Sequence, residues 1–318
     1  MDNGKQQRGM ALLVVLLALA LISILVDNIL DKNKRMYLRT VSEVDKTQIK
    51  WYTYAAENMA KNILHRDKIN YPRKTYLAQN WAQTELQIGG GKVRGRIFDA
   101  QACFNLNALN QMVENEKNTS YVVKVFRQLL LNLGVDASQI AQIISSISNR
   151  QISDVLMNKE IYNGVHFAQG SSELLAQQRR MQDISELRMI SGIDFDLYQK
   201  LLPYVCVLPT STLLVNINTL KESQGVLLAA LLLKDINSFP ATTLLKKRPR
   251  TGWDSVAMFL TQLQLKESET TEAISNLVVS SNYFSVHLNT IIGDYQFNQY
   301  SLVVWKGKRI HTVHRKYR

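Results

Sequence analysis

Two cysteines, Cys103 and Cys206, are the candidates for redox or metal chemistry in this chain. They stand too far apart to form a C-x-x-C metal motif, but they could pair as a disulfide in an oxidising compartment. Such a bond would close a loop of about a hundred residues and contribute about 4–5 kcal/mol in the chain-entropy treatment. The sequence leaves the disulfide and two buried free thiols open as alternatives.

Other residue types that carry catalysis do not fall into a catalytic pattern. The chain contains neither G-x-S-x-G nor H-E-x-x-H. The triplet Gly89-Gly90-Gly91 lacks the spacing and the Lys-Ser/Thr pair of a phosphate-binding loop, and it indicates a turn instead. Asp194 and Asp196 are paired carboxylates, but the start of a helix explains them more simply. We therefore predict no enzymatic activity.

Histidine is the other common metal ligand, and this chain has five: His65, His166, His287, His311 and His314. The last two are three residues apart on a predicted strand. Because side chains alternate between the two faces of a strand, we expect His311 and His314 on opposite faces and without a shared metal.

The stretch LRMISGIDFDLYQKLLPYV resembles a helix-hairpin-helix, a motif that can hold a DNA phosphate on backbone N–H groups. The net charge of +12 would suit such an anionic partner. That mode favours Gly-x-Gly, however, and here Asp194 follows Gly192-Ile193, with Asp196 close by. Because two carboxylates would repel phosphate, we expect a structural hairpin and no nucleic acid. Salt-sensitive binding to DNA would overturn this expectation.

The elements that must position these residues begin with an apolar run. From Met10 to Val26 the only polar side chain is Ser23, and Ile29 and Leu30 extend the run. As a helix it spans roughly 30 Å, the thickness of the hydrocarbon layer of a bilayer. It is longer than the apolar centre of a cleaved signal peptide, and no small-x-small site follows it. The run therefore predicts a membrane anchor rather than a secretion signal or a buried helix.

Charge does not settle which side of the membrane the rest of the chain occupies. Two basic residues precede the apolar run, and four follow it: Lys32, Lys34, Arg35 and Arg39. A count of positive charges would place the body in the cytoplasm, but the rule is weak for large domains. The body can form a packed core on either side, because 46% of the 318 residues are hydrophobic.

The helix is expected to continue beyond the membrane and to cover Met10–Leu64 in total. An apolar stripe recurs at spacings of four, three and four residues, which places its members on one face: Tyr52, Ala56, Met59 and Ile63. Glu57, Lys61 and Asn62 are predicted to lie away from this stripe. A one-sided stripe requires a partner layer, and a sheet would serve.

Four strands are predicted around a long helical segment. The first starts at Val93, and three more, over 284–288, 295–305 and 310–313, are joined by tight turns into an antiparallel meander. Between them, from about Asp99 to Asn282, the pattern is helical and shows no convincing repeat. The predicted fold class is α+β: a long N-terminal helix packed on a small antiparallel sheet, with a large all-helical insert between the first strand and the C-terminal strands.

Local signals mark helix ends within the insert. Gly134 suits the end of one helix, and Asp136 suits the start of the next. Two pairs have the spacing of a capping box: Asp183 with Glu186, and Thr219 with Glu222.

The start of the chain resembles a type IV prepilin leader. A short basic head ends in Arg8-Gly9, and an uninterrupted apolar helix follows. In that superfamily an aspartyl prepilin peptidase on the cytoplasmic face cuts after the glycine and methylates the new N-terminus. The resemblance implies cleavage between Gly9 and Met10, N-methylation of Met10, a cytoplasmic leader and a periplasmic body.

One position indicates which family within the pilin-like superfamily the chain resembles. Most pilin-like subunits carry Glu at the fifth mature position, which is Val14 here. A missing Glu is typical of the minor pseudopilin K family of type II secretion, whose members cap the pseudopilus. Four stretches resemble markers of that family: CFNLNAL at Cys103–Leu109, ISELRMISGI at Ile184–Ile193, LLPYVCVLPT at Leu201–Thr210 and LVNINTL at Leu214–Leu220.

The family resemblance implies a non-enzymatic tip subunit, anchored in the inner membrane of a Gram-negative bacterium by a single span. It would initiate pseudopilus assembly and support export of folded proteins across the outer membrane. Its implied partners are the I and J minor pseudopilins, the pseudopilus, the prepilin peptidase, and either secreted substrates or the outer-membrane secretin. The alternative is a DNA-handling minor pilin of a type IV pilus or uptake machine that uses the hairpin.

The resemblance also implies a division of the chain. It comprises a cleaved leader at 1–9, a transmembrane segment at 10–30, the helix and first strand of a pseudopilin domain at 31–98, an inserted hairpin-containing, SAM-like helical domain at 99–282, and C-terminal strands at 283–318. Some relatives hold calcium, which prefers carboxylate oxygens. This chain has SISNRQISDV where the family often carries an acidic, Trp-containing stretch. We therefore expect no cofactor and no metal.

Overall fold

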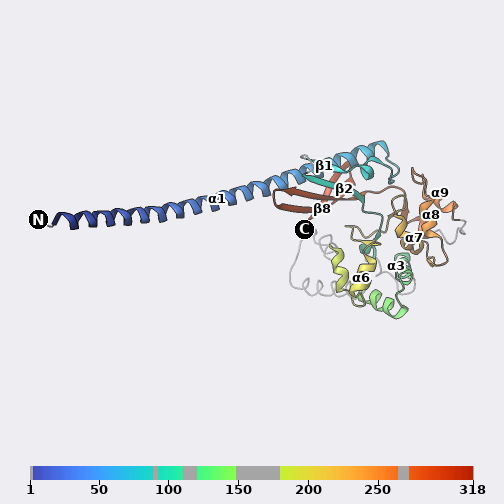
Figure 1. Ribbon diagram of the computed structural model, residues 1–318. Helices are drawn as coiled ribbons and strands as arrows, with labels where there is room; N and C mark the ends of the chain where they lie inside the picture. The colour runs from blue at the N-terminus through green and yellow to red at the C-terminus, as the bar shows by residue number, and fades with distance from the viewer. Residues whose placement is uncertain (1–2, 89–91, 110–119, 148–179, 264–271, 318) are drawn as a thin grey trace, which may run out of the picture.

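The computed structural model describes residues 3–88, 92–109, 120–147, 180–263 and 272–317. Its first element is a single helix, α1 (Asn3–Asn70), whose N-terminal half projects far from the rest of the chain (Figure 1). The predicted helix over Met10–Leu64 is therefore confirmed and is longer at both ends. It ends before Pro72, whose ring lacks an N–H and cannot continue a helix.

The C-terminal part of α1 packs on a sheet, as expected, but through a face that is rotated from the predicted stripe. Its fully buried apolar residues are Ala56, Ala60 and Leu64. Met59, a member of the predicted stripe, remains 37% exposed, whereas Glu57 is only 1% exposed. The prediction was wrong because small alanines let the helix backbone approach the sheet, and hydrogen bonds across that contact offset the burial of a carboxylate.

The sheet is antiparallel and has five strands. They are β1 (Leu86–Ile88), β2 (Val93–Asp99), β7 (Tyr283–Ile292), β8 (Tyr295–Lys306) and β9 (Arg309–Tyr317), in the spatial order β1-β2-β7-β8-β9. The predicted first strand and C-terminal meander are confirmed. β1 adds an edge of three residues, which is too short to give a periodic signal. Between the sheet and α1 lies a core that includes Trp81, Ile97 and Phe284.

Between β2 and β7 the chain forms a second body, called the insert below. Among the described residues, its helices include α3 (Tyr121–Asn132), residues 137–147, η2 (Ile184–Met189), α6 (Phe195–Leu201), η3 (Glu222–Gln224), α7 (Gly225–Leu231), α8 (Ala241–Lys246) and α9 (Val256–Thr261). A further short helix, α2 (Asn80–Gln83), precedes β1. The helices of the insert share one apolar core, which includes Phe104, Phe126 and Trp253.

The insert is not all-helical as predicted, because two pairs of short parallel strands close it. β3 (Phe104–Asn105) pairs with β4 (Val205–Cys206), and β5 (Val215–Asn216) pairs with β6 (Leu277–Val278). Each pair joins the beginning of a helical stretch to its end. The insert therefore consists of two consecutive units that are closed in the same way.

Each of the two units contains an asparagine that makes the same pair of hydrogen bonds. The side chain of Asn107 accepts a hydrogen bond from Met181 N (2.7 Å) and donates one to Met181 O (3.0 Å). The side chain of Asn218 does the same with Trp253, at 2.7 Å and 2.9 Å. Both asparagines end an Asn-x-Asn sequence whose first asparagine is the last residue of a short strand, β3 or β5. The structure thus shows a repeated device where the sequence showed no convincing repeat.

Most of the predicted helix ends are confirmed. Gly134 has φ +81 after α3, and Asp136 accepts the backbone N–H of Gln139 at 3.0 Å. The capping box of Asp183 and Glu186 is present at the start of η2. The box predicted at Thr219 is wrong, because the Thr219 hydroxyl instead donates to Asp99, at 2.6 Å, and η3 begins after Lys221.

Candidate functional site

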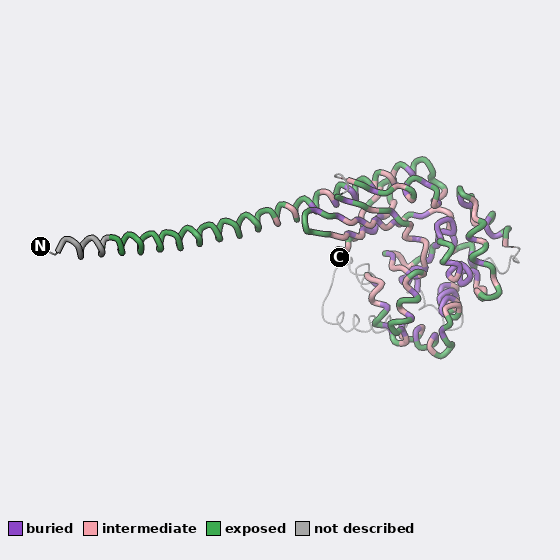
Figure 2. Tube along the Cα trace, in the orientation of Figure 1, coloured by how far each residue is buried: buried purple, intermediate pink, exposed green. Residues whose placement is uncertain are grey.

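The first functional surface is the bare N-terminal part of α1. Met10 and Leu30 are 69% and 58% exposed, and Figure 2 shows exposure along this whole segment. Ser23 and Asn28 each donate a hydrogen bond to the carbonyl four residues earlier, at 2.9 Å and 2.8 Å, so these polar groups are satisfied within the helix. The segment has the length and composition to cross a bilayer.

The predicted processing site lies at the beginning of this surface. Gly9 and Met10 fall in the first turns of α1, and Val14 follows about one turn later, 64% exposed. The apolar residues from Met10 to Val26 include no carboxylate that could pair with an amine of a neighbouring subunit. The cleavage itself stays a prediction.

A second exposed surface, the outer stripe, runs along α1 opposite the sheet. Its members recur at spacings of four, three and seven residues, and are Tyr37, Val41, Val44 and Trp51, with exposed fractions of 68%, 39%, 51% and 70%. This heptad-like spacing keeps them on one face of the helix. Thr53, about 200° around the helix from Trp51, is buried with its hydroxyl 2.7 Å from that of Thr290. The outer stripe therefore faces away from the chain's own sheet.

Glu57 joins α1 to the last two strands of the sheet. Its carboxylate accepts two hydrogen bonds from the guanidinium of Arg315 on β9, at 2.7 Å and 2.9 Å. Four further donors surround it: Thr312 Oγ1 at 2.6 Å, Gln299 Nε2 at 2.7 Å, Ser301 Oγ at 2.9 Å and Lys61 Nζ at 3.2 Å. Both carboxylate oxygens are thus paired, which permits a charge inside a packed contact.

Burial alone would raise the pKa of Glu57, but the hydrogen bonds from Arg315, Thr312 and Ser301 prevail and lower the pKa to about 2. The carboxylate is therefore ionised throughout the neutral range. Sequence reasoning missed this residue because Glu57 and Lys61 have the i, i+4 spacing of an ordinary exposed ion pair on a helix. No local signal indicates that strands more than two hundred residues away cover it.

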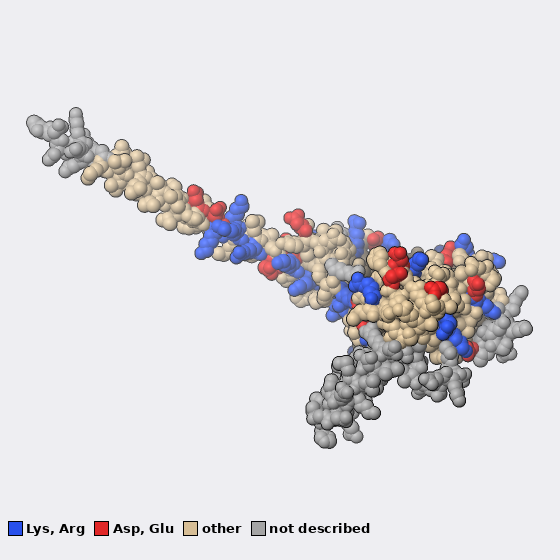
Figure 3. Space-filling view, turned by 90° about the horizontal axis from the view of Figure 1, so that it is seen from below, with Lys and Arg blue, Asp and Glu red and all other residues tan. Residues whose placement is uncertain are grey.

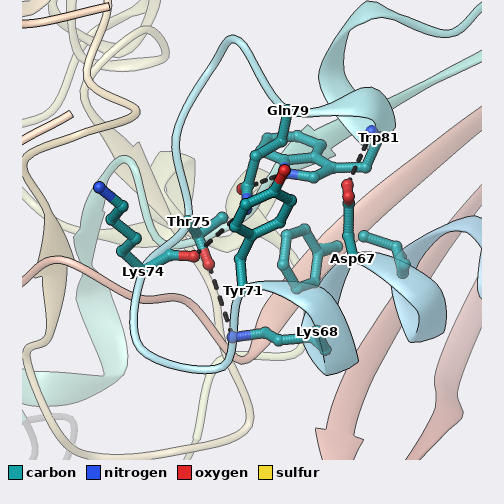
Figure 4. A pocket seen from close by; sticks show the side chains of 9 residues that line it. Asp67, Lys68, Tyr71, Lys74, Thr75, Gln79 and Trp81 are labelled. Carbon is teal, nitrogen blue, oxygen red and sulfur yellow. Dashed lines mark hydrogen bonds between the residues drawn. The ribbon is translucent and has the colours of Figure 1, made fainter. Parts of the chain in front are cut away.

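A small pocket lies where α1 ends, and Figure 4 shows Asp67 and Lys68 reaching from the helix toward the loop that follows. Asp67 accepts the backbone N–H of Trp81 at 2.9 Å, and Lys68 Nζ donates to Ser280 Oγ at 2.9 Å. Burial raises the pKa of Asp67 and lowers the pKa of Lys68 to about 8. Gln79 also holds the indole N–H of Trp81, at 2.9 Å. These contacts fix the chain's own loop, so the pocket has a structural role.

A second polar junction joins the sheet to the insert. Asp99, the last residue of β2, accepts hydrogen bonds from Ser281 Oγ (2.5 Å), Thr219 Oγ1 (2.6 Å) and Asn216 Nδ2 (3.1 Å). Burial raises the pKa of Asp99, although the hydrogen bonds oppose this rise. The junction ties the end of β2 to the second unit of the insert and to the residues just before β7. The insert is therefore fixed to the sheet rather than tethered only by its connecting segments.

Cys103 and Cys206 form a disulfide, with 5.8 Å between their Cα atoms. The parallel pairing of β3 and β4 brings the two cysteines together. The bond lines a cleft of about 780 Å³, which lies between the insert and the face of the sheet that is turned away from α1. Lys316 on β9 also lines this cleft and forms an ion pair with Asp183, so a second contact connects the sheet to the insert.

His311 and His314 lie on the same face of the sheet, contrary to expectation. A β-bulge places one extra residue in β9, because Leu302 pairs with His314 whereas the next residue of β8 pairs with Thr312. The extra residue, Val313, reverses the alternation of side chains. Within the described ranges, no three His, Cys, Asp or Glu side chains are grouped to hold one metal ion. His166, Gly89-Gly90-Gly91 and most of the stretch SISNRQISDV lie outside those ranges.

The hairpin considered for DNA binding is engaged by the chain itself. The backbone N–H of Ser191 donates to Ser146 Oγ at 3.0 Å, and Gln139 Nε2 donates to Gly192 O at 2.9 Å. Asp194 caps α6, as predicted. The turn is thus directed at residues 137–147, which supports a structural hairpin.

These features define a class of protein. A long helix that is bare and apolar in its first half, and packed on an antiparallel sheet in its second, is the architecture of a membrane-anchored pilin-like subunit. Two family models described as type II secretion system (T2SS), protein K match residues 102–210 and 215–280, which are the two closed units of the insert. The chain belongs to the type II secretion system protein K family and is a minor pseudopilin.

Relatives match over almost the whole chain. Type II secretion system protein K of Klebsiella pneumoniae is 40% identical over 319 residues, which cover 98% of this chain and 97% of that protein. The protein of the same name from Pectobacterium carotovorum subsp. carotovorum is 39% identical over 320 residues, with coverage of 98% and 97%. A similar chain of known structure belongs to the crystal structure of the GspK-GspI-GspJ complex from the enterotoxigenic Escherichia coli type 2 secretion system. The two chains are 29% identical and superpose with a TM-score of 0.71, and the match covers 88% of this chain and 99% of that chain.

The comparisons place the chain in protein transport. Its family is one of structural subunits rather than enzymes, and its long apolar N-terminal helix fits a single-pass inner-membrane anchor. Neither the comparisons nor the hairpin geometry favours the DNA-handling alternative.

Proposed function

We propose that this chain caps the type II secretion pseudopilus, initiates its assembly with I-type and J-type minor pseudopilins, and so supports export of folded proteins across the outer membrane. The observation that carries the proposal is Val14 on the bare apolar surface of α1. A carboxylate at this depth in a membrane is costly unless it is paired. In a pilin-like fibre its partner would be the N-terminal amine of the neighbour above. A subunit without that carboxylate suits the apex, where no such neighbour exists.

The position of the insert supports the same role. It lies at the end of the body remote from the N-terminus of α1 (Figure 1). If the subunits of the fibre are parallel, that end points away from the membrane, toward the place of any further subunit. Because Asp99 and the contact between Lys316 and Asp183 fix the insert to the sheet, it would obstruct such a subunit.

The proposed topology has the N-terminus in the cytoplasm and the body in the periplasm. The disulfide supports it, because the periplasm is oxidising whereas the cytoplasm keeps thiols reduced. Gly9 supports it too, since a residue without a side chain at the start of the span does not obstruct a peptidase on the cytoplasmic face.

Mass spectrometry of the full protein tests the topology. From cells with an active prepilin peptidase we expect a chain that begins at Met10, carries one N-terminal methyl group and has both cysteines oxidised. Cells without the peptidase should yield a chain that keeps residues 1–9. An unprocessed chain in cells with the active peptidase would contradict the proposed topology.

The outer stripe is the proposed contact with the partner subunits. A similar chain of known structure is part of a GspK-GspI-GspJ complex, which supports partners of the same types here. Long helices with an exposed heptad-like seam associate through that seam. Trp51, the most exposed large side chain of the stripe, has the residue type that dominates binding energy in many interfaces.

Replacing Trp51 with alanine is expected to weaken the complex with I-type and J-type partners by at least roughly 30-fold, the effect of losing an interface hot spot. Affinity can be measured by titrating the detergent-solubilised chain with the two partners. Phe195→Ala is the matched control, because Phe195 is a 69% exposed aromatic residue on the insert and should leave the affinity unchanged. Equal affinities for the Trp51 variant and the wild type would exclude the outer stripe as the contact.

A further inference from the structure

A bare basic stalk lies between the membrane span and the body. Residues 31–41 are all exposed, and α1 reaches the sheet at Ser42, whose hydroxyl lies 2.7 Å from that of Tyr295. The stalk contains one acidic residue, Asp31, against four basic residues, called the collar below: Lys32, Lys34, Arg35 and Arg39. Figure 3 shows blue side chains gathered on the helix beyond the tan apolar segment, with red side chains between that segment and the blue group. In the described part of the chain none of the four forms an ion pair.

The spacing of the collar matches the depth of the lipid headgroups. At 1.5 Å per residue, Lys32, Lys34 and Arg35 lie about 3–8 Å beyond Leu30 along the helix axis. The headgroup layer on each side of a bilayer is roughly 5–7 Å thick. Arg39 lies about 13 Å beyond Leu30, but its long stem can bring its charged end back toward the layer.

Helix geometry directs these side chains toward the membrane. In an α-helix the Cα–Cβ bonds tilt toward the N-terminus, which here is the end inside the bilayer. Arg35 shows this direction, because its Nε donates a hydrogen bond to Asp31 O, one turn nearer the span, at 3.3 Å. Tyr37, 68% exposed in the same stalk, is an amphipathic residue of the kind enriched at the membrane–water boundary.

We propose that the collar binds the headgroups of anionic phospholipids. Depth, direction and the excess of basic residues over Asp27 and Asp31 all favour lipid over an acidic protein surface, which would have to enter the headgroup layer to reach these residues. Binding would fix the depth of the membrane-spanning helix and hold the subunit in the bilayer. The inference rests on the membrane anchor alone, so it stands or falls separately from the proposed role at the tip.

The test uses the full chain in vesicles of phosphatidylcholine with phosphatidylglycerol as the minor component. Membrane around the protein is excised with styrene–maleic acid copolymer, purified on the protein, and analysed for the ratio of the two lipids. We expect phosphatidylglycerol to be enriched about two- to five-fold over the bulk vesicle, and high salt to reduce the enrichment. Replacing all four collar residues with glutamine should return the ratio to that of the bulk.

The matched control is Lys46→Gln with Lys50→Gln, which removes two positive charges from the same helix about 24–30 Å beyond Leu30 and should leave the enrichment unchanged. Three results would overturn the proposal: a bulk lipid ratio around the wild-type chain, an unchanged enrichment in the collar variant, or an equal loss in the control. Alkaline extraction of the vesicles shows whether the collar variant is inserted in the membrane. If it is not inserted, the proposal is judged by the wild-type chain alone, whose enrichment in phosphatidylglycerol must fall as salt is raised. A collar variant that keeps the enrichment but loses its protein partners would identify a protein interface instead.

Discussion

Replacing Glu57 with alanine is expected to lower the free energy of unfolding of the body by about 3 kcal/mol, the lower end of the effect of removing one partner from a buried ion pair, because the side chain of Arg315 is 35% exposed and can be hydrated. The variant leaves the donors of Gln299, Ser301 and Thr312 without their acceptor in the contact between α1 and the sheet. Denaturant unfolding of the detergent-solubilised chain, followed by tryptophan fluorescence, to which the buried Trp81 and Trp253 contribute, measures the effect.

Glu43→Ala is the matched control for this prediction. Glu43 lies on the same helix and pairs with Lys46 at 2.9 Å, but the side chains of both residues are largely exposed, so its removal should change stability little. If the two variants lowered stability equally, the hydrogen-bonded cluster around Glu57 would not hold the helix to the sheet.

The pH dependence of stability gives a second measurement on the same variant. The pKa of Glu57 is lowered to about 2 in the folded chain from an ordinary value near 4.5. Its contribution is therefore fully present above about pH 4.5 and is lost as the pH falls toward 2. The difference in stability between the wild type and the alanine variant should shrink across this window. A difference that stays constant with pH would contradict the lowered pKa.

Replacing Cys103 and Cys206 with serine is expected to lower the free energy of unfolding by about 2–5 kcal/mol, since the bond closes a loop with a sequence separation of 103. The physical reason is that the cross-link restricts the unfolded chain, and a longer loop is restricted more. Denaturant unfolding with and without a reductant gives the measurement.

The reductant supplies the control for the cysteine variant. It should lower the unfolding midpoint of the wild type toward that of the serine variant and leave the variant itself unchanged. A wild-type midpoint that does not respond to complete reduction would show that the bond contributes nothing to stability.

Sequence reasoning succeeded where a property depends on near neighbours in the chain. Uniform apolar composition gave the bare helix, alternation gave the long strands, and short polar side chains gave the caps at Asp136, Asp183 and Asp194. Each of these signals is complete within a few residues. The same kind of reasoning failed at Thr219, which fits a cap by spacing but donates to Asp99 instead, because a buried carboxylate from β2 lies beside it.

The bulge in β9 illustrates a second kind of failure. His311 and His314 share a face because one residue was inserted against β8, and neither histidine nor its neighbours indicates that insertion. The prediction for Glu57 failed for a related reason. Its partners Ser301 and Arg315 lie more than two hundred residues away in the sequence.

The sequence by itself determined the apolar N-terminal helix, because composition encodes it, and the strand meander and the helical character of the insert, because the period of apolar residues encodes them. It also showed that Val14 stands where most pilin-like subunits have Glu, because a single residue type decides that point. Only the tertiary structure decided which side of α1 meets the sheet, how the insert divides into two closed units, and that a charged residue holds the helix in place. These outcomes depend on which distant surfaces come into contact. The free energy of burying a charge is set by the groups that surround it, and the order of residues along a helix does not specify those groups.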